Sequence, residues 1–150
     1  MSDPAASAPI SLGFLLWHAT LRWQRDIAAA LKPYDLTHVQ FVLLVSTWWL
    51  GENGDGPPSQ AQVAAHAAAD VMMTSSVLRT LERRELVRRS PDPADARVKR
   101  LTVTEAGHRL ALETVAVVEA ADAAFFARAG SPRQVLGVLS KLAAPEEGSR

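Results

Sequence analysis

The sequence predicts a mostly α-helical protein with one small β-hairpin, placed as the wing of a helix-turn-helix. Three observations predict this fold. Two short helices separated by a brief turn are expected at 59–67 and 71–84. Two β-rich runs, 86–90 and 98–103, flank the turn-forming segment PDPADA. Long helices rich in Ala, Val and Leu are expected on both sides of this unit, within 11–32 and 104–142.

The N-terminal third begins with a Pro-, Ala- and Ser-rich stretch, residues 1–10, which predicts a disordered tail. The first helix, 11–32, is expected to end before Pro33, because proline cannot continue the helical hydrogen-bond ladder. Thr37 is a suitable N-cap for a second helix, whose high apolar content predicts burial on most of its sides. The segment GENGDGPP, 51–58, has the composition of a loop.

The two helices of the helix-turn-helix have their own start signals. Ser59 with Gln62 three residues later forms a capping box for the first of them. Asp70 is a good N-cap for the second, 71–84. With the hairpin, these helices predict a winged helix-turn-helix at about 37–103.

The C-terminal third is expected to be two further helices. Thr104 caps a long helix from Glu105 to about Arg128, and Ser131-Pro132 opens a last helix through Leu142. Residues 143–150 are expected to be a flexible tail. Because 150 residues are typical of one domain, residues 11–142 are predicted to be a single domain.

Charge is concentrated in one segment, although the net charge is zero. Residues 79–100 hold 8 basic and 4 acidic side chains, whereas residues 1–78 hold 3 and 6, and residues 101–150 hold 5 and 6. A local positive patch on a neutral body is typical of proteins that bind specific DNA sites. The alternative interpretation of this basic segment is a solvated helix face, and charge alone would favour it.

The helix at 71–84 has two unlike sides. At the helical period, one side gathers Val71, Thr74, Val77, Leu78 and Leu81. Ser and Thr are mediocre helix formers, so their concentration on the other side is not explained by helix stability. Short polar side chains let a helix approach base edges in the major groove. The DNA-contacting candidates on this helix are Met72, Ser75, Ser76, Arg79, Thr80 and Arg83.

The hairpin supplies a second set of candidates. Basic side chains on its strands and tip suit contacts with the DNA backbone, and the predicted ones are Arg88, Arg97, Lys99 and Arg100, with Arg89 beside them. Arg97 is placed to enter a narrow minor groove, with Asp95 holding its guanidinium. A surface ion pair of little energetic value is the alternative interpretation.

These segments resemble the multiple-antibiotic-resistance regulator (MarR) family of winged-helix transcription factors. The resemblance rests above all on DPADARVKRLTVTEAG, 92–107, where Asp95 and Arg97 match the family's wing tip and Gly107 its entry into a long helix. LTHVQFVLL (36–44) and LERRELVRR (81–89) also fit, and the match spans roughly 11–142. Val103 stands where Leu is commoner. Glu85 stands where the family usually has glycine, which leaves the shape of the corner between helix and wing open.

The resemblance implies a homodimer held by the terminal helices, 11–32 and 104–142, and the physical chemistry agrees, because a long apolar helix needs more cover than a small core provides. A twofold dimer places two recognition helices about one DNA turn apart and predicts a palindromic operator. An intrachain bundle is the alternative.

Family members commonly bind small aromatic or anionic compounds, which release DNA. An arginine near indole rings suits an aromatic carboxylate. The candidates here are Trp17, His18, Arg22, His38 and Trp48, with Trp23 and Trp49 nearby, although aromatic residues at helical spacing are more often core. A metal site is not expected, because the four His are scattered.

The sequence therefore predicts a dimeric, sequence-specific DNA-binding regulator, a repressor released from its operator by a small ligand. A winged-helix module that binds proteins without DNA is the alternative. An enzyme is not expected, since there is no Cys, no phosphate loop and no nucleophile motif. No cofactor and no membrane partner are expected, and the cytoplasm is the expected location.

Overall fold

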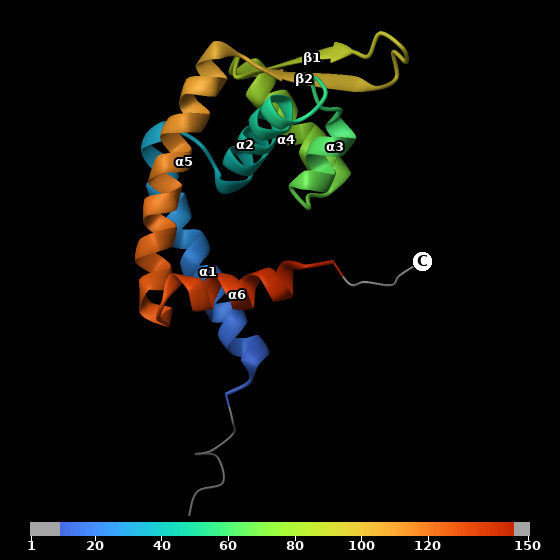
Figure 1. Cartoon of the computed structure of the whole chain (residues 1–150). Helices are drawn as coiled ribbons and strands as arrows, with labels where there is room; N and C mark the ends of the chain where they lie inside the picture. Colours follow the sequence, from blue (N-terminus) through green and yellow to red (C-terminus); the bar gives the residue numbers. More distant parts are fainter. Residues whose placement is uncertain (1–9, 146–150) are drawn as a thin grey trace, which may run out of the picture.

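The computed structural model describes residues 10–145. It has a helical stalk and, at one end of it, a winged lobe (Figure 1). The stalk consists of α1 (Leu12–Leu31), α5 (Glu105–Phe126) and α6 (Pro132–Ala143). The winged lobe consists of α2 (His38–Asn53), α3 (Gln60–His66), α4 (Val71–Arg83), β1 (Val87–Pro91) and β2 (Lys99–Val103). The predicted fold class, mostly α with one antiparallel hairpin, is confirmed.

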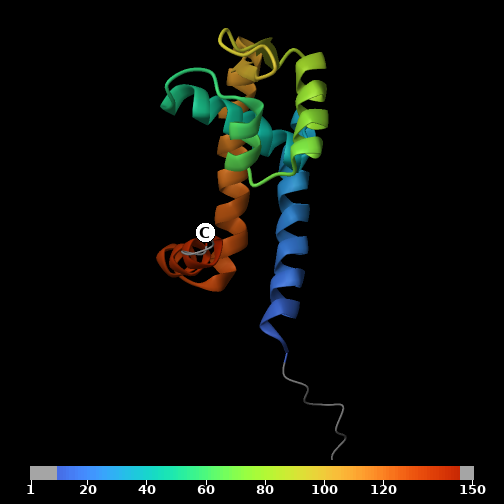
Figure 2. The same cartoon turned by 90° about the vertical axis from the view of Figure 1, so that its right-hand side faces the viewer.

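The stalk is built on two antiparallel helices. α1 and α5 run side by side in both views, and α6 lies across the end of the stalk that is far from the hairpin (Figure 2). The hairpin and α6 are therefore separated by most of the length of α5.

In the part of the chain that the structure describes, no helix combines the length and apolar character that a membrane crossing needs.

Each predicted N-cap accepts a hydrogen bond from the backbone N–H three residues later. Thr37 and Ser59 both form complete capping boxes, with Gln40 and Gln62. Such caps satisfy backbone donors that have no partner within the helix, and each is worth about 1 kcal/mol. The other predicted caps are Asp70, Thr104 and Ser131. Ser11, which was expected within the first helix, also serves as a cap.

Several predicted boundaries are wrong by a few residues. The loop expected at 51–58 begins later, because α2 continues to Asn53, whose side-chain amide donates to the Trp49 carbonyl. α1 does end before Pro33 as predicted, at Leu31, and Pro33 lies in a short 3₁₀ turn, Lys32–Tyr34. The last helix reaches Ala143, and α5 ends at Phe126 before a 3₁₀ turn, Ala127–Ala129. Residues 1–9 and 146–150 of the predicted tails lie outside the described residues.

The core of the winged lobe forms around α2. Leu43 and Leu44 of α2 are fully buried, and they belong to one cluster with Leu78 and Leu81 of α4 and Leu101 of β2. Ile27 and Leu31 at the end of α1 join the same cluster, so the stalk enters the lobe without a break in packing. This packing fixes α4 with its apolar side inward.

The corner between α4 and the hairpin is left-handed despite lacking glycine. Glu85 has φ +59°, and its carbonyl oxygen accepts the Thr104 hydroxyl at 2.7 Å. The sequence left the shape of this corner open, and here the backbone adopts a left-handed turn at Glu85, held by Thr104, Leu81 and Leu86. The Leu86 N–H donates to the Leu81 carbonyl, and the Leu86 carbonyl accepts the Thr104 N–H.

The first turn of α5 has a glycine, Gly107, where a larger residue would not fit. A Cβ at this position would collide with the carbonyl oxygen of Leu86 and with the side chain of Val103. α5 can therefore approach the hairpin closely only because position 107 has no side chain.

Candidate nucleic-acid interface

The helix-turn-helix positions α4 by burying one of its sides. Thr74, Leu78 and Leu81 are fully buried, whereas Val71 is 64% exposed. Val71 belongs to the same side by helical period, but as the first residue after the Asp70 cap it is not covered. The other side of α4 faces away from the lobe.

We call this exposed side of α4 the outer stripe, and it consists of Met72, Ser76, Arg79 and Arg83. Ser75 and Thr80 flank it and are half-buried. Arg83 donates to the Thr80 hydroxyl at 3.0 Å, and in residues 10–145 no ion pair engages Arg79. The stripe thus combines a cationic side chain without an acidic partner, short hydroxyls and one large apolar side chain.

Two arginines of the hairpin strands attach the wing to the helix-turn-helix. We call Arg89, Arg100 and the groups that they bind the base of the wing, and the loop that holds Asp95 and Arg97 its tip. Arg89 donates to Glu82 at 3.0 Å and to Gln60 at 3.1 Å, and its side chain is only 18% exposed. Arg100 donates to Asp92 at 3.0 Å and reaches Gln62 at 3.4 Å. These contacts join β1 to α4 and both strands to α3.

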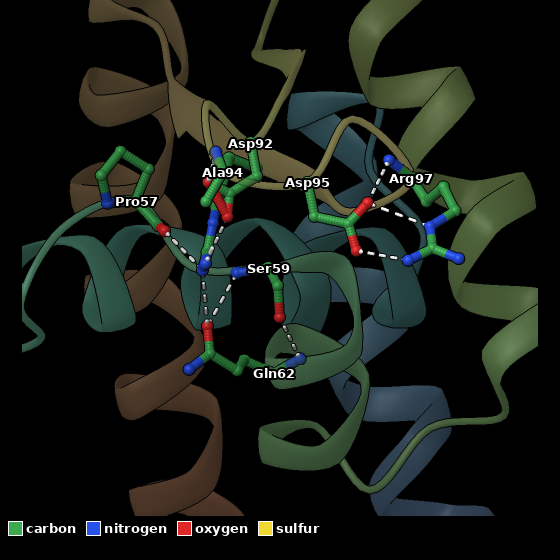
Figure 3. A network of polar contacts seen from close by, with 8 residues as sticks. Pro57, Ser59, Gln62, Asp92, Ala94, Asp95 and Arg97 are labelled. Atoms are coloured by element: carbon green, nitrogen blue, oxygen red, sulfur yellow. Dashed lines mark hydrogen bonds and ion pairs between the residues drawn. The ribbon is translucent and has the colours of Figure 1, made fainter.

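Backbone pairing reinforces this base. The Leu101 N–H donates to the Pro58 carbonyl at 2.9 Å, and Ser59 bridges Arg100 in an antiparallel sense. Figure 3 shows Pro57, Ser59 and Gln62 gathered beneath Asp92 of the hairpin. Gln62 serves twice, since its amide oxygen accepts both the Ser59 N–H and the Arg100 guanidinium.

The tip of the wing is organised differently. Asp95 accepts two hydrogen bonds from the Arg97 guanidinium, at 3.1 and 3.2 Å, and a third from the Arg97 backbone N–H (Figure 3). The Arg97 side chain is nevertheless 90% exposed. A forked pair of this kind fixes the direction of the guanidinium while its outer side stays open.

Both carboxylates of the wing are held in the charged form. The pKa of Asp95 lies below its usual value, mainly because the Arg97 side chain donates to it. The pKa of Asp92 is also lowered, first by the Ala94 backbone N–H and then by Arg100. The wing therefore keeps both ion pairs throughout the physiological pH range.

The basic hairpin side chains named from the sequence differ in their exposure and in the groups they contact. Arg97 and Lys99 are exposed, the latter with its ammonium group 3.3 Å from the Ala96 carbonyl. Arg88 is exposed but borders a hollow with Glu82, Glu85 and Glu105. The guanidinium of Arg100 is occupied within the protein, and its contact with DNA stays a prediction.

The residues named for a ligand site lie in separate places. His18 and Arg22 line a hollow of about 720 Å³ between α1, the end of α5 and α6, which Arg25, Phe125 and Arg128 also line. Trp17 is 64% exposed on α1 and does not line it.

The remaining aromatic candidates are engaged in packing. Trp23 donates to Asp122 at 2.7 Å and packs edge-on against His38, whose pKa is lowered by burial and partly restored by Asp122. Trp48 stacks on His108, and Trp49 stacks on His66.

Sequence reasoning missed the partners that bind Arg89 and Arg100, namely Gln60, Gln62, Glu82 and Asp92. From the sequence, Gln62 is indicated only as part of a cap. The signal available was the presence of four acidic side chains within the basic segment 79–100, but their pairing depends on the fold. Within residues 10–145, no three His, Cys, Asp or Glu side chains cluster as a metal site would require.

Comparison with known proteins places this geometry in a family. The model of the MarR family matches residues 36–99, which include the helix-turn-helix and most of the hairpin. An HTH-type transcriptional regulator of Bacillus subtilis, YdcH, is 42% identical over 132 residues, which is 88% of this chain and 89% of that protein.

Two solved structures extend the similarity to the whole described fold. CouR of Rhodococcus jostii bound to p-coumaroyl-CoA is 29% identical, with a TM-score of 0.78 over 95% of this chain and 100% of its own. A MarR family protein of Mycobacterium tuberculosis in complex with salicylic acid is 35% identical, with a TM-score of 0.67 over 93% of this chain and 99% of its own. The chain therefore belongs to the MarR family of winged-helix transcriptional regulators.

Proposed function

We propose that this chain is a homodimeric repressor that binds a palindromic operator, with α4 in the major groove and the wing tip in the adjoining minor groove. The observation that carries the proposal is the outer stripe, a row of exposed Ser and Arg side chains on the second helix of a helix-turn-helix. The alternative, a protein-binding module, would be favoured by an apolar or acidic stripe. The proposed activity is binding without catalysis.

The roles of the stripe residues follow from their reach. Arg79 and Arg83 are long enough for guanine edges or phosphates, and Ser75, Ser76 and Thr80 allow the helix to approach base edges. On the wing, Arg97 and Lys99 are the proposed backbone and minor-groove contacts. We assign Arg100 mainly to holding the wing, since its guanidinium already binds Asp92.

The homodimer is supported by the apolar surface of the stalk. α6 has no buried residue, and its leucines are largely exposed, Leu136 at 67% and Leu142 at 70%. The first turns of α1 expose another apolar set, Leu12, Phe14, Leu15, Leu16 and Trp17. So much exposed apolar surface marks an interface, and a second copy would bury it. Light scattering of the native chain should report twice the monomer mass, and Leu142→Asp should reduce it.

The proposed effector is an anionic aromatic compound. The hollow at the end of the stalk offers Arg22, Arg25 and Arg128 as cations and Phe125 as an aromatic wall. The Mycobacterium tuberculosis relative was solved with salicylic acid, which has this chemistry. A ligand that prefers the dimer with its recognition helices wrongly spaced would release DNA by a population shift. Titration calorimetry with salicylate should show binding that Arg22→Ala weakens and Arg133→Ala, outside the hollow, does not.

The deciding experiment selects bound fragments from random duplex DNA and measures affinity against salt. The native chain should enrich a palindrome and lose affinity steeply as salt rises. Arg79→Ala should cost about 1–3 kcal/mol of binding free energy and relax sequence preference, whereas Arg133→Ala on α6 should change neither. A chain that binds no duplex at low salt would contradict the proposal.

A further inference from the structure

Two neighbouring methionines lie at the start of α4. The sequence has three Met and no Cys, and Met72 and Met73 are adjacent. Met72 is 82% exposed and Met73 is 42% exposed, next to Val71 at 64%. Large apolar side chains that are exposed close together often mark a contact site. We call these three exposed side chains at the N-terminal end of α4, where the outer stripe begins, the apolar patch.

The patch lies where a recognition helix meets bases. The N-terminal residues of such a helix are the ones that reach base edges in the major groove. Met72 lies one turn before Ser76, and the stripe continues to Arg79. A flexible, polarisable thioether suits contact with the C5-methyl group of thymine, the apolar feature of that groove.

We propose that Met72 and Met73 form an oxidant-sensitive contact with DNA, so that their conversion to methionine sulfoxide weakens operator binding. The inference rests on the proposed DNA-binding function and adds a modification site to it. The oxidant class is a two-electron oxygen donor such as hypochlorous acid. The thioether sulfur takes the oxygen atom and loses two electrons, chlorine is reduced to chloride, and one proton is released to water.

The structure favours reaction and effect at the same place. Both sulfur-bearing side chains are open to solvent, and no thiol in the sequence competes for the oxidant. The Met73 N–H is held by the Asp70 cap at 2.9 Å, so the helix start does not depend on either thioether. Oxidation therefore changes the chemistry of the contact surface and leaves the fold of α4 in place.

The sulfoxide opposes binding in two ways. It converts an apolar contact into a strongly polar one, which no longer suits a thymine methyl. It also adds an oxygen that can only accept hydrogen bonds, and the thymine methyl has no donor to offer it. Burying such a group without a donor is unfavourable.

The test uses the full chain and the palindromic duplex obtained by selection. The chain is treated with limited hypochlorous acid, the sulfoxides are located by peptide mass spectrometry, and affinity is measured by fluorescence anisotropy at fixed salt. We expect sulfoxide at Met72 and Met73 and a loss of affinity of about tenfold. Methionine sulfoxide reductases A and B with a thiol reductant should restore the original affinity.

Two double variants separate this mechanism from general damage. Met72→Leu with Met73→Leu keeps the apolar volume, so its affinity should fall much less on treatment than that of the native chain. Met72→Gln with Met73→Gln imitates the polarity of the sulfoxide and should bind about tenfold more weakly without any oxidant. Circular dichroism on all samples checks that the helix content is retained.

The outcomes distinguish the two proposals. If the untreated chain binds its duplex but the doubly oxidised chain binds equally well, the inference is overturned and the proposed function stands. It is also overturned if the Leu variant loses affinity on treatment as much as the native chain does. If the untreated chain selects no duplex, both proposals fall.

Discussion

The base and the tip of the wing use the same residue type for different purposes. At the base, the Arg89 and Arg100 side chains are 18% and 33% exposed and are bound to Glu82 and Asp92. At the tip, Arg97 is 90% exposed while its inner edge is held by Asp95. The density of basic residues therefore marks the region, but only their partners tell a structural arginine from one that is free to meet DNA.

The largest expected effect on stability concerns the close contact between α5 and the start of the hairpin. Gly107→Ala places a Cβ against the Leu86 carbonyl oxygen, so the helix must move away from the hairpin. We expect a loss of about 3 kcal/mol in the free energy of unfolding, measured by urea denaturation. Gly137→Ala is the matched control, because a Cβ there meets nothing within 4 Å and alanine favours the helix, so stability should rise slightly. Equal effects at both positions would show that the wing base is not tightly seated.

The next effect concerns the tip alone. Arg97→Ala should reduce DNA affinity about tenfold and flatten its salt dependence, because the proposed contact with the minor groove is lost. The free energy of unfolding should change by less than about 0.5 kcal/mol, since an exposed ion pair contributes little. Anisotropy titrations and urea denaturation of the same variant measure both quantities. A variant that unfolds more easily but binds DNA normally would reverse the roles of tip and base.

Much of this comparison was accessible from the sequence. The caps at Thr37, Ser59, Asp70 and Thr104 act within four residues, so their local signals survive folding. The Asp95–Arg97 pair is equally local. The anchoring of Arg89 was not predictable in this way, because Gln60 lies 29 residues away and meets it only after the hairpin packs on α3.

Arg89 gives the complementary prediction at the base. Arg89→Ala removes hydrogen bonds to Glu82 and Gln60 and leaves both groups partly buried, so the free energy of unfolding should fall by about 1 kcal/mol. DNA affinity of the folded fraction should change little. Arg88→Ala is the neighbouring control, and denaturation should find its stability within about 0.5 kcal/mol of the native value. A larger loss of DNA affinity than of stability would place Arg89 among the DNA contacts.

A smaller gain is expected at the corner that leads into the wing. Glu85 has φ +59°, a conformation that costs a non-glycine residue roughly 1 kcal/mol, so Glu85→Gly should stabilise the fold by about 0.5 kcal/mol after the greater freedom of the unfolded chain is counted. Glu113→Gly within α5 should instead destabilise it by about 1 kcal/mol. Thermal unfolding measures both. A loss at position 85 would mean that the side chain, not the backbone, holds the corner.

Glu85 also shows where local sequence reasoning stops. The absence of glycine leaves the shape of the corner open, and only the fold supplies the contacts from Leu81, Leu86 and Thr104 that hold the left-handed turn. Two ligand candidates show the same limit of local reasoning, because His38 packs against Trp23 and Trp48 stacks on His108, contacts that the linear sequence does not reveal. Their part in a ligand site stays a prediction.

The two wing carboxylates provide the finest test of the difference between tip and base. Because the pKa of each is lower in the folded chain than in the unfolded one, each stabilises the fold above the unfolded pKa of about 3.9, and this contribution is lost as the pH falls through the folded pKa. Carboxyl carbon shifts followed by NMR across this acidic range measure each group separately. Arg97→Ala should raise the pKa of Asp95 toward its usual value, because the Arg97 side chain is the main cause of the shift.

The same substitution should leave Asp92 almost unchanged, since the Ala94 N–H and Arg100 hold its pKa down. Conversely, Arg100→Ala should raise the pKa of Asp92 only in part, because the Ala94 N–H still donates to it. If Arg97→Ala moved both carboxylates together, the tip and the base would form one electrostatic network. Arg97 would then help to hold the wing as well as point toward DNA, and the tenfold loss expected for its removal would no longer measure a DNA contact alone.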